Sequence, residues 1–342
     1  MPVPGVTRAR LLDLVAAFPR RRLVALVDLV ADGFTVGVPK RVSREAPVLI
    51  LRHVSDELRP GGGANAVANV RALGGTPVTV GVVGADDAGR RLVADLAARG
   101  IDVSRIRTVP GYRTPTKTRI LGGSPTGAKQ QIVRIDVEGT FEPDAALLTA
   151  LARDLASAAA GADGALLSDY GYGAVRPDLA DGLRTALGTS RPVILDSRFS
   201  LGRFRGLTAA TPNEEELVAA VPAARDDGDT AVLEAALALR ASLGLSALLA
   251  TRGSRGMLVV SCDAPPVAIP VHGTDQVADV TGAGDTVLAA FSLALASGAS
   301  PVEAAALATV AAGIVVMKMG TATASAAEVA EAIAADHALF PV

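Results

Sequence analysis

The 342-residue sequence predicts an α/β protein whose mostly parallel sheet is covered by helices on both faces. Three observations favour this class. Short apolar runs alternate with helical stretches between residues 78 and 271, which is typical of parallel strands joined by crossover helices. Residues 34–59 and 114–135 instead show the alternation of strands that expose one face. A glycine-rich turn at residues 282–284 leads into an apolar helical segment.

Composition limits the chemistry that such a protein can perform. Hydrophobic residues make up 50% of the chain and aromatic residues only 3%, so the core must consist mainly of Ala, Val and Leu. A formal net charge of −2 supplies no basic field for nucleic acid and no polybasic face for a membrane. One cysteine cannot form an internal disulfide, and three scattered histidines lack metal-ligand spacing. Without a membrane-length apolar run or a leader pattern, we expect a cytoplasmic protein that acts on small molecules.

The first expected strand carries a candidate binding residue. A helix at residues 11–18 precedes a short apolar strand at residues 23–27, which leads into Asp28 and Asp32. Carboxylates just beyond the carboxyl end of a parallel strand lie where open α/β sheets bind ligands. Asp32 is therefore a candidate for holding substrate hydroxyls, and the alternative is a turn residue before Gly33. Later strands are expected at residues 78–83, 165–168, 193–196, 207–211, 247–251, 257–260 and 267–271.

Two segments fall outside the strand and helix alternation. Residues 34–59 and 114–135 are expected to pair as one small β lid over a cleft. Because the apolar face of such a lid must be buried, we also expect a homodimer joined through it. Between these segments, glycines at residues 61–63 precede Asn65 and a helical stretch. Glycines allow close backbone approach to a ligand, and Asn65 offers a donor and an acceptor, which suits a sugar; a plain glycine-rich turn is the alternative.

Polar clusters follow several expected strands and should converge at one edge of the sheet. Asn213 and Glu216 come after the strand at residues 207–211, and their spacing places both on one face of a first helical turn. Such a pair can hold water around a magnesium ion. The alternative is a helix cap beside ordinary surface acids.

Residues 279–286, Asp-Val-Thr-Gly-Ala-Gly-Asp-Thr, contain the strongest indication of chemistry. Gly282, Ala283 and Gly284 leave successive backbone N–H groups bare at the start of a helix, where aligned peptide dipoles favour an anion such as phosphate. Asp285 beside that anion would take a proton from the hydroxyl that attacks phosphorus. The alternative is a turn followed by a first-turn aspartate. Neither a P-loop nor a dinucleotide glycine fingerprint occurs.

These motifs resemble the signatures of the PfkB, or ribokinase-like, family of carbohydrate kinases over roughly residues 20–330. Residues 61–65 are similar to the N-terminal signature, and residues 279–285 to the C-terminal one. Within the family, the sequence is most similar to the kinases that phosphorylate D-glycero-D-manno-heptose 7-phosphate at O1. The segments that carry this likeness are residues 43–48, 130–136, 167–170, 211–213 and 245–252.

The resemblance implies a single three-layer α/β/α kinase domain over residues 1–342. Many heptose kinases carry a fused nucleotidyltransferase, and we expect this chain to hold the kinase portion only. ATP and Mg²⁺ are the implied cofactors, together with a monovalent cation such as K⁺. Asp285 is the implied base, with Gly282, Ala283 and Gly284 as the anion hole.

Further roles follow from the same resemblance. The sugar would be held by Asp32, Gly62 and Asn65. The nucleotide would contact Asn213, Thr251, Gly253 and Gly256. Asn213 and Glu216 would serve the magnesium ion, and groups near Asp279, Thr281 and Gly320 would ligate the monovalent cation.

An acceptor that already carries a phosphate needs a second anion site, for which guanidinium groups are suited. The candidates are Arg119 and Arg134 in the lid strands and Arg198, Arg203 and Arg205 after the strand at residues 193–196.

The chain departs from the heptose kinases at two places. Tyr172 stands where they carry Lys, and Asp-Ser-Arg at residues 196–198 replaces their Asp-Pro-Lys. The expected function is ATP-dependent phosphotransfer to a sugar or sugar phosphate, with heptose 7-phosphate as the expected acceptor. The alternatives are another specificity of the family, such as fructose, ribose or a nucleoside, and a sugar-binding homologue without catalysis.

Overall fold

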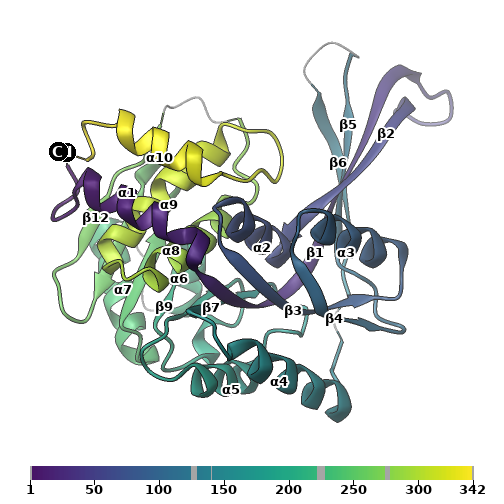
Figure 1. Ribbon diagram of the computed structural model, residues 1–342. Helices are drawn as coiled ribbons and strands as arrows, with labels where there is room; N and C mark the ends of the chain where they lie inside the picture. The colour runs from purple at the N-terminus through teal and green to yellow at the C-terminus, as the bar shows by residue number, and fades with distance from the viewer. Residues whose placement is uncertain (1, 125–128, 140, 222–227, 274–277, 341–342) are drawn as a thin grey trace.

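The computed structural model describes residues 2–124, 129–139, 141–221, 228–273 and 278–340 (Figure 1). The strands are β1 (Arg22–Val42), β2 (Leu49–Gly62), β3 (Thr76–Gly84), β4 (Asp102–Val109), β5 (Thr116–Gly122), β6 (Gln130–Val137), β7 (Gly164–Asp169), β8 (Val193–Ser197), β9 (Ala209–Ala210), β10 (Ala247–Thr251), β11 (Met257–Ser261) and β12 (Val267–Ile269). The helices are α1 (Arg8–Ala17), α2 (Gly63–Ala72), α3 (Asp87–Ala98), α4 (Ala145–Ala159), α5 (Pro177–Leu187), α6 (Glu214–Ala220), α7 (Asp229–Leu243), α8 (Ala283–Ala296), α9 (Pro301–Val316) and α10 (Ala326–Ala335).

The main sheet has the strand order β12-β11-β10-β9-β8-β7-β1-β3-β4. All neighbouring strands from β10 to β4 run parallel, and only β11 and β12 are antiparallel to their neighbours. Parallel pairing of this kind requires crossover helices that cover the faces of the sheet.

Alternate residues of the central strand pack into two separate apolar cores. Leu23, Ala25 and Val27 of β1 join one core, which includes side chains of α1, α2, α8, α9 and α10. Val24 and Leu26 join the other core, with side chains of α4, α5 and α7. Because both faces of β1 are apolar, the strand can be buried on both sides. The expected three-layer α/β/α fold is confirmed.

The lid is a second sheet that shares β1 with the body and projects from it (Figure 1). Residues 22–28 of β1 pair with β3, and the strand then continues between β2 and β5, with β6 beyond β5. The short strand that we expected to end near Asp28 is therefore wrong in length, because β1 runs for 21 residues to Val42. The lid strands supply the hydrogen-bond partners that allow it to continue.

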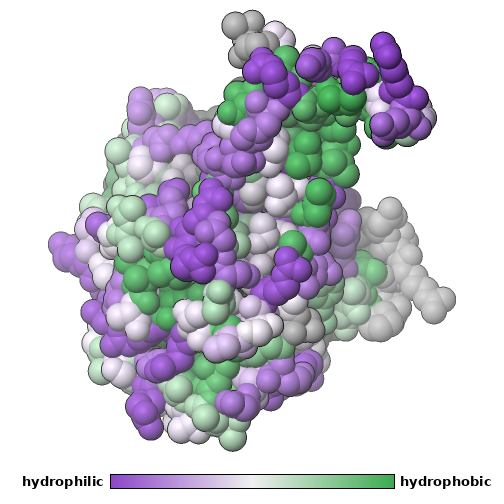
Figure 2. All heavy atoms as spheres, turned by 90° about the vertical axis from the view of Figure 1, so that its right-hand side faces the viewer, coloured by the Kyte–Doolittle hydropathy of each residue, from purple (hydrophilic) through white to green (hydrophobic). Residues whose placement is uncertain are grey.

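Apolar side chains remain exposed on the lid, and Figure 2 shows hydrophobic atoms over this part of the surface. Val54 of β2 and Val133 and Ile135 of β6 are each about half exposed. Among the described helices, none combines the length and the apolar character that a membrane span requires.

Two other strand expectations differ from the structure. The strand expected at residues 207–211 is reduced to Ala209–Ala210, and β4 was not expected. Strand β4 lies at the edge of the main sheet and has a mixed burial pattern, so it lacks the continuous apolar run that marks the buried strands.

Candidate active site

Asp285 lies in the first turn of α8, just after the glycine-rich turn. Gly282 caps this helix with φ of 81°, a left-handed conformation that favours glycine. A Cβ atom at Gly282 would lie 2.4 Å from Nδ2 of Asn65, so a larger residue does not fit. The Gly284 position has open space beside its Cα atom. The Ala283 N–H of this helix start donates to the carbonyl oxygen of Val280 at 3.2 Å. The N–H groups of Gly282 and Gly284, next to the buried carboxylate, are therefore the ones available to an anion.

Both oxygens of the Asp285 carboxylate accept hydrogen bonds from buried neighbours. The Tyr170 hydroxyl donates to Oδ1 at 2.8 Å, and Asn65 Nδ2 donates to Oδ2 at 2.9 Å. Asn69 Nδ2 donates to Oδ1 of Asn65 at 3.2 Å, and the Thr286 hydroxyl donates to Oδ1 of Asn69 at 3.0 Å. These contacts fix the Asp285 carboxylate between α2, α8 and the loop after β7.

The electrostatic surroundings of Asp285 suit a base that works near neutral pH. Burial raises the pKa of Asp285 from 3.8 to about 7, against the lowering effect of the hydrogen bonds from Asn65 and Tyr170. The nearby charge of Asp32 raises this pKa further, and Lys117 lowers it. A general base is most effective when its pKa lies close to the working pH.

Asp32 lies in β1 on the lid side of the site and is 3% exposed. The Arg119 guanidinium of β5 donates to Asp32 Oδ1 at 2.9 Å. Burial raises the pKa of Asp32, whereas the charge of Arg119 lowers it. Asp32 is therefore a strand residue, and the turn that the sequence suggested before Gly33 does not form.

The glycines before Asn65 are explained largely by packing. A Cβ atom at Gly61 would lie 2.7 Å from the Asp32 carboxyl carbon, and one at Gly62 would lie 2.8 Å from a Val30 methyl group. Gly62 has φ of 50° and caps helix α2. The glycines therefore allow β2 to approach β1 closely, and their expected contact with the sugar stays a prediction.

The candidate cations differ in their contacts. Arg134 pairs with Asp136 at 2.9 Å, Arg119 holds Asp32, and the guanidinium of Arg205 donates to the carbonyl oxygen of Phe204 at 2.9 Å. Arg198 lies over the ring of Phe199, 5.6 Å from its centroid.

Asn213 and Glu216 form a capping box at the start of α6. Asn213 Oδ1 accepts from the Glu216 N–H at 2.8 Å, and Glu216 Oε2 accepts from the Asn213 N–H at 2.9 Å. Burial raises the pKa of Asp196, and the negative charge of Glu216 raises it further. Mg²⁺ takes oxygen ligands and keeps several waters, so the Glu216 and Asp196 carboxylates and the Asn213 amide are a suitable donor set for it.

The other nucleotide candidates lie at the end of β10 and in the turn that follows it, and the cation candidates lie before α8 and after α9. Thr251 forms an isolated bridge with Asn213, and Gly253 has φ of 55° beside open space. Gly256 is explained by packing, since a Cβ atom there would lie 2.1 Å from the Ile269 carbonyl oxygen. Asp279 accepts from the N–H groups of Thr281 and Gly320.

Those two contacts bring the loop around Gly320 against residues 279–281. Burial tends to raise the pKa of Asp279, but the hydrogen bonds from Thr281 and Gly320 outweigh it, and the pKa is lowered. Each Asp279 oxygen accepts one N–H and keeps a free lone pair, so this carboxylate and nearby backbone carbonyls are the oxygen donors that a cation here could use.

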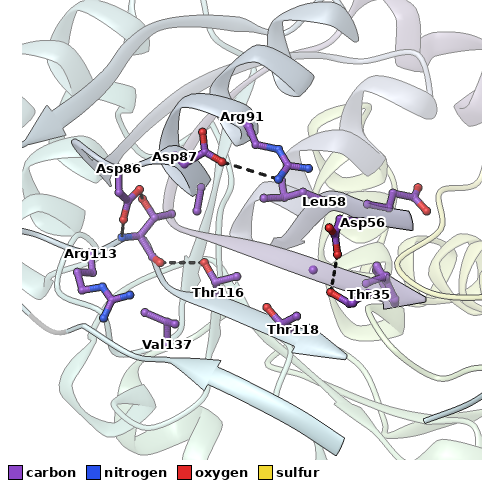
Figure 3. A pocket seen from close by; sticks show the side chains of 15 residues that line it. Thr35, Asp56, Leu58, Asp86, Asp87, Arg91, Arg113, Thr116, Thr118 and Val137 are labelled. Carbon is purple, nitrogen blue, oxygen red and sulfur yellow. Dashed lines mark hydrogen bonds and ion pairs between the residues drawn. The ribbon is translucent and has the colours of Figure 1, made fainter. Parts of the chain in front are cut away.

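A hollow of about 380 Å³ lies on the other face of the lid, beside the start of α3 (Figure 3). Thr116 and Thr118 line it, and they alternate along β5 with Lys117 and Arg119. Successive side chains of a strand point to opposite faces, so this hollow is separate from the site that contains Asp285.

Comparison with known proteins shows which family the chain belongs to. Residues 38–328 match the pattern that defines the pfkB family carbohydrate kinases. The chain belongs to the PfkB family of carbohydrate kinases. This kinase is 42% identical over 316 residues to the bifunctional protein HldE of Halorhodospira halophila, covering 91% of this chain and 63% of that protein. It is 39% identical to HldE of Azotobacter vinelandii, covering 92% and 64%. The kinase thus spans less than two thirds of the length of these relatives.

Solved structures share the fold of this PfkB kinase. Phosphofructokinase-2 from Escherichia coli in complex with substrates and products superposes with a TM-score of 0.73 at 21% identity, covering 92% of this chain and 98% of that one. Arabidopsis thaliana ribokinase complexed with ribose and ATP gives a TM-score of 0.69 at 21% identity, with the same coverage.

Sequence reasoning did not single out Lys117 and Asn69 near the base of this kinase, and it included Tyr170 only as part of a polar cluster, without a role. Tyr170 ends a Ser-Asp-Tyr cluster after an expected strand, and Lys117 precedes Arg119 by two residues, so it shares a face of β5 with that arginine. The first pattern placed the cluster with Tyr170 at the sheet edge, and the second could have placed Lys117 beside it. Asn69 follows Asn65 by four residues on α2, a spacing that puts both on one face.

Proposed function

We propose that this PfkB kinase transfers the terminal phosphoryl group of ATP to O1 of D-glycero-D-manno-heptose 7-phosphate, with Asp285 as the base. The observation that carries the proposal is the position of Asp285, a buried carboxylate of raised pKa at the N-terminus of α8. The N–H groups of Gly282 and Gly284 at this helix start can bind the transferred phosphoryl group while Asp285 takes the proton of the attacking hydroxyl.

The contacts of the other site residues suit them to hold the sugar, the magnesium ion and the nucleotide. Asp32, fixed by Arg119, is suited to accept hydrogen bonds from sugar hydroxyls. Asn213, Glu216 and Asp196 are the residues that would hold Mg²⁺, which in phosphoryl transfer neutralises phosphate charge. Thr251 pairs with Asn213, and Gly253 lies in the turn that follows Thr251. A nucleotide bound beside the Mg²⁺ residues would contact both.

Two observations support a phosphorylated acceptor. The relatives named bifunctional protein HldE match over nine tenths of this chain, and the sequence resembles the heptose 7-phosphate kinases. The face of the lid that carries Asp32 also carries Lys117, Arg119 and Arg134. Burial lowers the pKa of Lys117, and the positive charge of Arg198 lowers it further. A charge-assisted contact from one of these cations to a sugar phosphate would add to binding.

Paired assays test the acceptor. We expect kcat/KM for heptose 7-phosphate to exceed that for free heptose by at least about tenfold, which corresponds to roughly 1.4 kcal/mol from one retained contact. Fructose phosphates and fructose form the second pair, and ADP release is the measurement. Equal or better use of the free sugars would assign the kinase to fructose, ribose or a related acceptor instead.

We also propose that two copies associate through the lid, because Val54, Val133 and Ile135 expose apolar surface there. Light scattering of the purified protein should give a dimer mass. An Ile135→Lys variant should shift this mass toward that of the monomer, and a monomeric wild-type protein would contradict the proposal.

A further inference from the structure

Tyr170 connects the lid to the carboxylate of Asp285. Its hydroxyl donates to Asp285 Oδ1 at 2.8 Å, and its ring lies under the Lys117 ammonium of lid strand β5, 5.4 Å from the ring centroid. The charges of Asp32 and Asp136 also act on the Lys117 ammonium. An ammonium over an aromatic face is attracted by the ring quadrupole.

A buried carboxylate holds the backbone of Tyr170 in place. Asp28, which is 2% exposed, accepts hydrogen bonds from the N–H groups of Tyr170, Tyr172 and Ala174. These contacts anchor the loop after β7 to the point where β1 leaves the main sheet. With its backbone held, Tyr170 can adjust mainly by rotation of its side chain, and the lid contacts that side chain through Lys117.

We propose that Lys117 and Tyr170 form a positioning relay from the lid to Asp285, in which Lys117 holds the Tyr170 ring and the Tyr170 hydroxyl orients the carboxylate toward the acceptor. The relay rests on the role of Asp285 as base that was proposed above. An ionised carboxylate has about four lone-pair sites, and Tyr170 and Asn65 occupy two of them. Lone pairs therefore remain for the proton of the acceptor hydroxyl.

The protonation states fit this arrangement. Burial and the charge of Asp285 raise the pKa of Tyr170 well above its usual value, so the phenol stays neutral and donates. Its hydrogen bond stabilises the ionised form of Asp285. The titratable and charged groups that face Asp285 come from four elements and are Asp32 of β1, Lys117 of β5, Tyr170 after β7 and Asp196 of β8.

The kinetic test uses the full chain and a double-mutant cycle. Tyr170→Phe keeps the ring but removes the donor, and Lys117→Met keeps the chain length but removes the charge. Each single variant should lower kcat about tenfold and change KM for ATP less than twofold. If Lys117 acts through Tyr170, the double variant should be no more than about twofold slower than the slower single variant. Lys40→Met, at an exposed lysine of the same lid, should match the wild type.

A cycle in which the two effects multiply would overturn the relay, because Lys117 would then act on Asp285 or the substrate independently. A Tyr170→Phe variant with wild-type kcat would also overturn it. Lys117→Arg should recover at least a third of the lost kcat, since a guanidinium also binds over an aromatic ring.

A second measurement needs no substrate and separates this proposal from that of the acceptor. The difference in unfolding free energy between Asp285→Asn and its parent, followed against pH, reports the pKa of Asp285 in the folded protein. The same difference is then measured with Tyr170→Phe present in both proteins. The pH midpoint of this difference, which reports the pKa of Asp285, should move upward by about one pH unit or more, since one hydrogen bond to a charged group is lost. An unmoved midpoint contradicts the relay. A moved midpoint in a protein that uses no sugar phosphate would support the Tyr170 contact and reject only the acceptor.

Discussion

The body and the lid hold polar groups around Asp285 by different physical means. On the body, Asn65 and Asn69 are at most 1% exposed and are fixed by hydrogen bonds. On the lid, Lys117 and Arg119 are partly exposed and rely on a ring contact and an ion pair. Leaving a buried polar group unpaired costs about 1–3 kcal/mol, whereas a partly exposed cation can exchange a protein contact for water. We therefore expect body substitutions to change stability as well as activity, and lid substitutions to change kcat or acceptor binding with little effect on stability.

The largest effect should come from Asp285→Asn on the body. The amide cannot accept the proton, so kcat should fall by about 10²–10⁴-fold while nucleotide binding survives. The fold should tolerate the change, because the Tyr170 hydroxyl can accept from the new amide instead of donating. A variant that retains more than a tenth of the wild-type rate would rule out Asp285 as the base.

The same variant should be more stable than the wild type at pH 8. The pKa of Asp285 in the folded protein, about 7, lies above its ordinary value of 3.8, so folding favours the protonated carboxyl. Its stabilising contribution is therefore complete below about pH 4 and is lost as the pH rises through 7. Urea titrations of both proteins at pH 5 and pH 8 should show an advantage of Asp285→Asn that grows with pH, by at least about 1 kcal/mol.

Two glycines of the same turn form a matched pair, because only one of them has a left-handed conformation and a close neighbour. Gly282→Ala should lower the free energy of unfolding by more than about 1 kcal/mol, because φ of 81° is unfavourable for alanine and the Cβ atom would meet Asn65. Gly284→Ala should be neutral or stabilising, since that position is helical and has open space. Thermal unfolding measures both. Equal destabilisation by the two variants would show that the turn is not shaped by the Asn65 contact.

A smaller and more selective effect should come from the lid. Arg119→Met removes the guanidinium that holds the Asp32 carboxylate. The carboxylate would then no longer be fixed in the orientation that accepts hydrogen bonds from sugar hydroxyls. The KM for the acceptor should rise by about tenfold, with kcat changed less than threefold, as expected for binding shared by ground and transition states. Arg41→Met, at an exposed arginine of the same lid, is the control and should change neither constant. A loss confined to kcat would place Arg119 in the catalytic step instead.

Some elements could be predicted closely because their causes are local. The strand expected at residues 247–251 coincides with β10, since a short apolar run between polar loops is sufficient to mark a strand buried on both faces. The turn at residues 282–284 was also found from local pattern alone. The pair Asn213 and Glu216 was ambiguous for the same reason, because a capping box and a magnesium site require the same residue types at the same spacing.

By itself, the sequence determined the α/β class, the separation of a lid from the body and the place of Asp285 at a helix start, because apolar periodicity and glycine conformation act over a few residues. Only the tertiary structure decided that β1 continues through Asp32, since its hydrogen-bond partners come from β2 and β5. It also decided that Tyr170 and Lys117 meet beside Asp285. Those three residues come from elements far apart in the chain, and no local pattern encodes which side chains the packing of a lid onto a sheet edge will bring together.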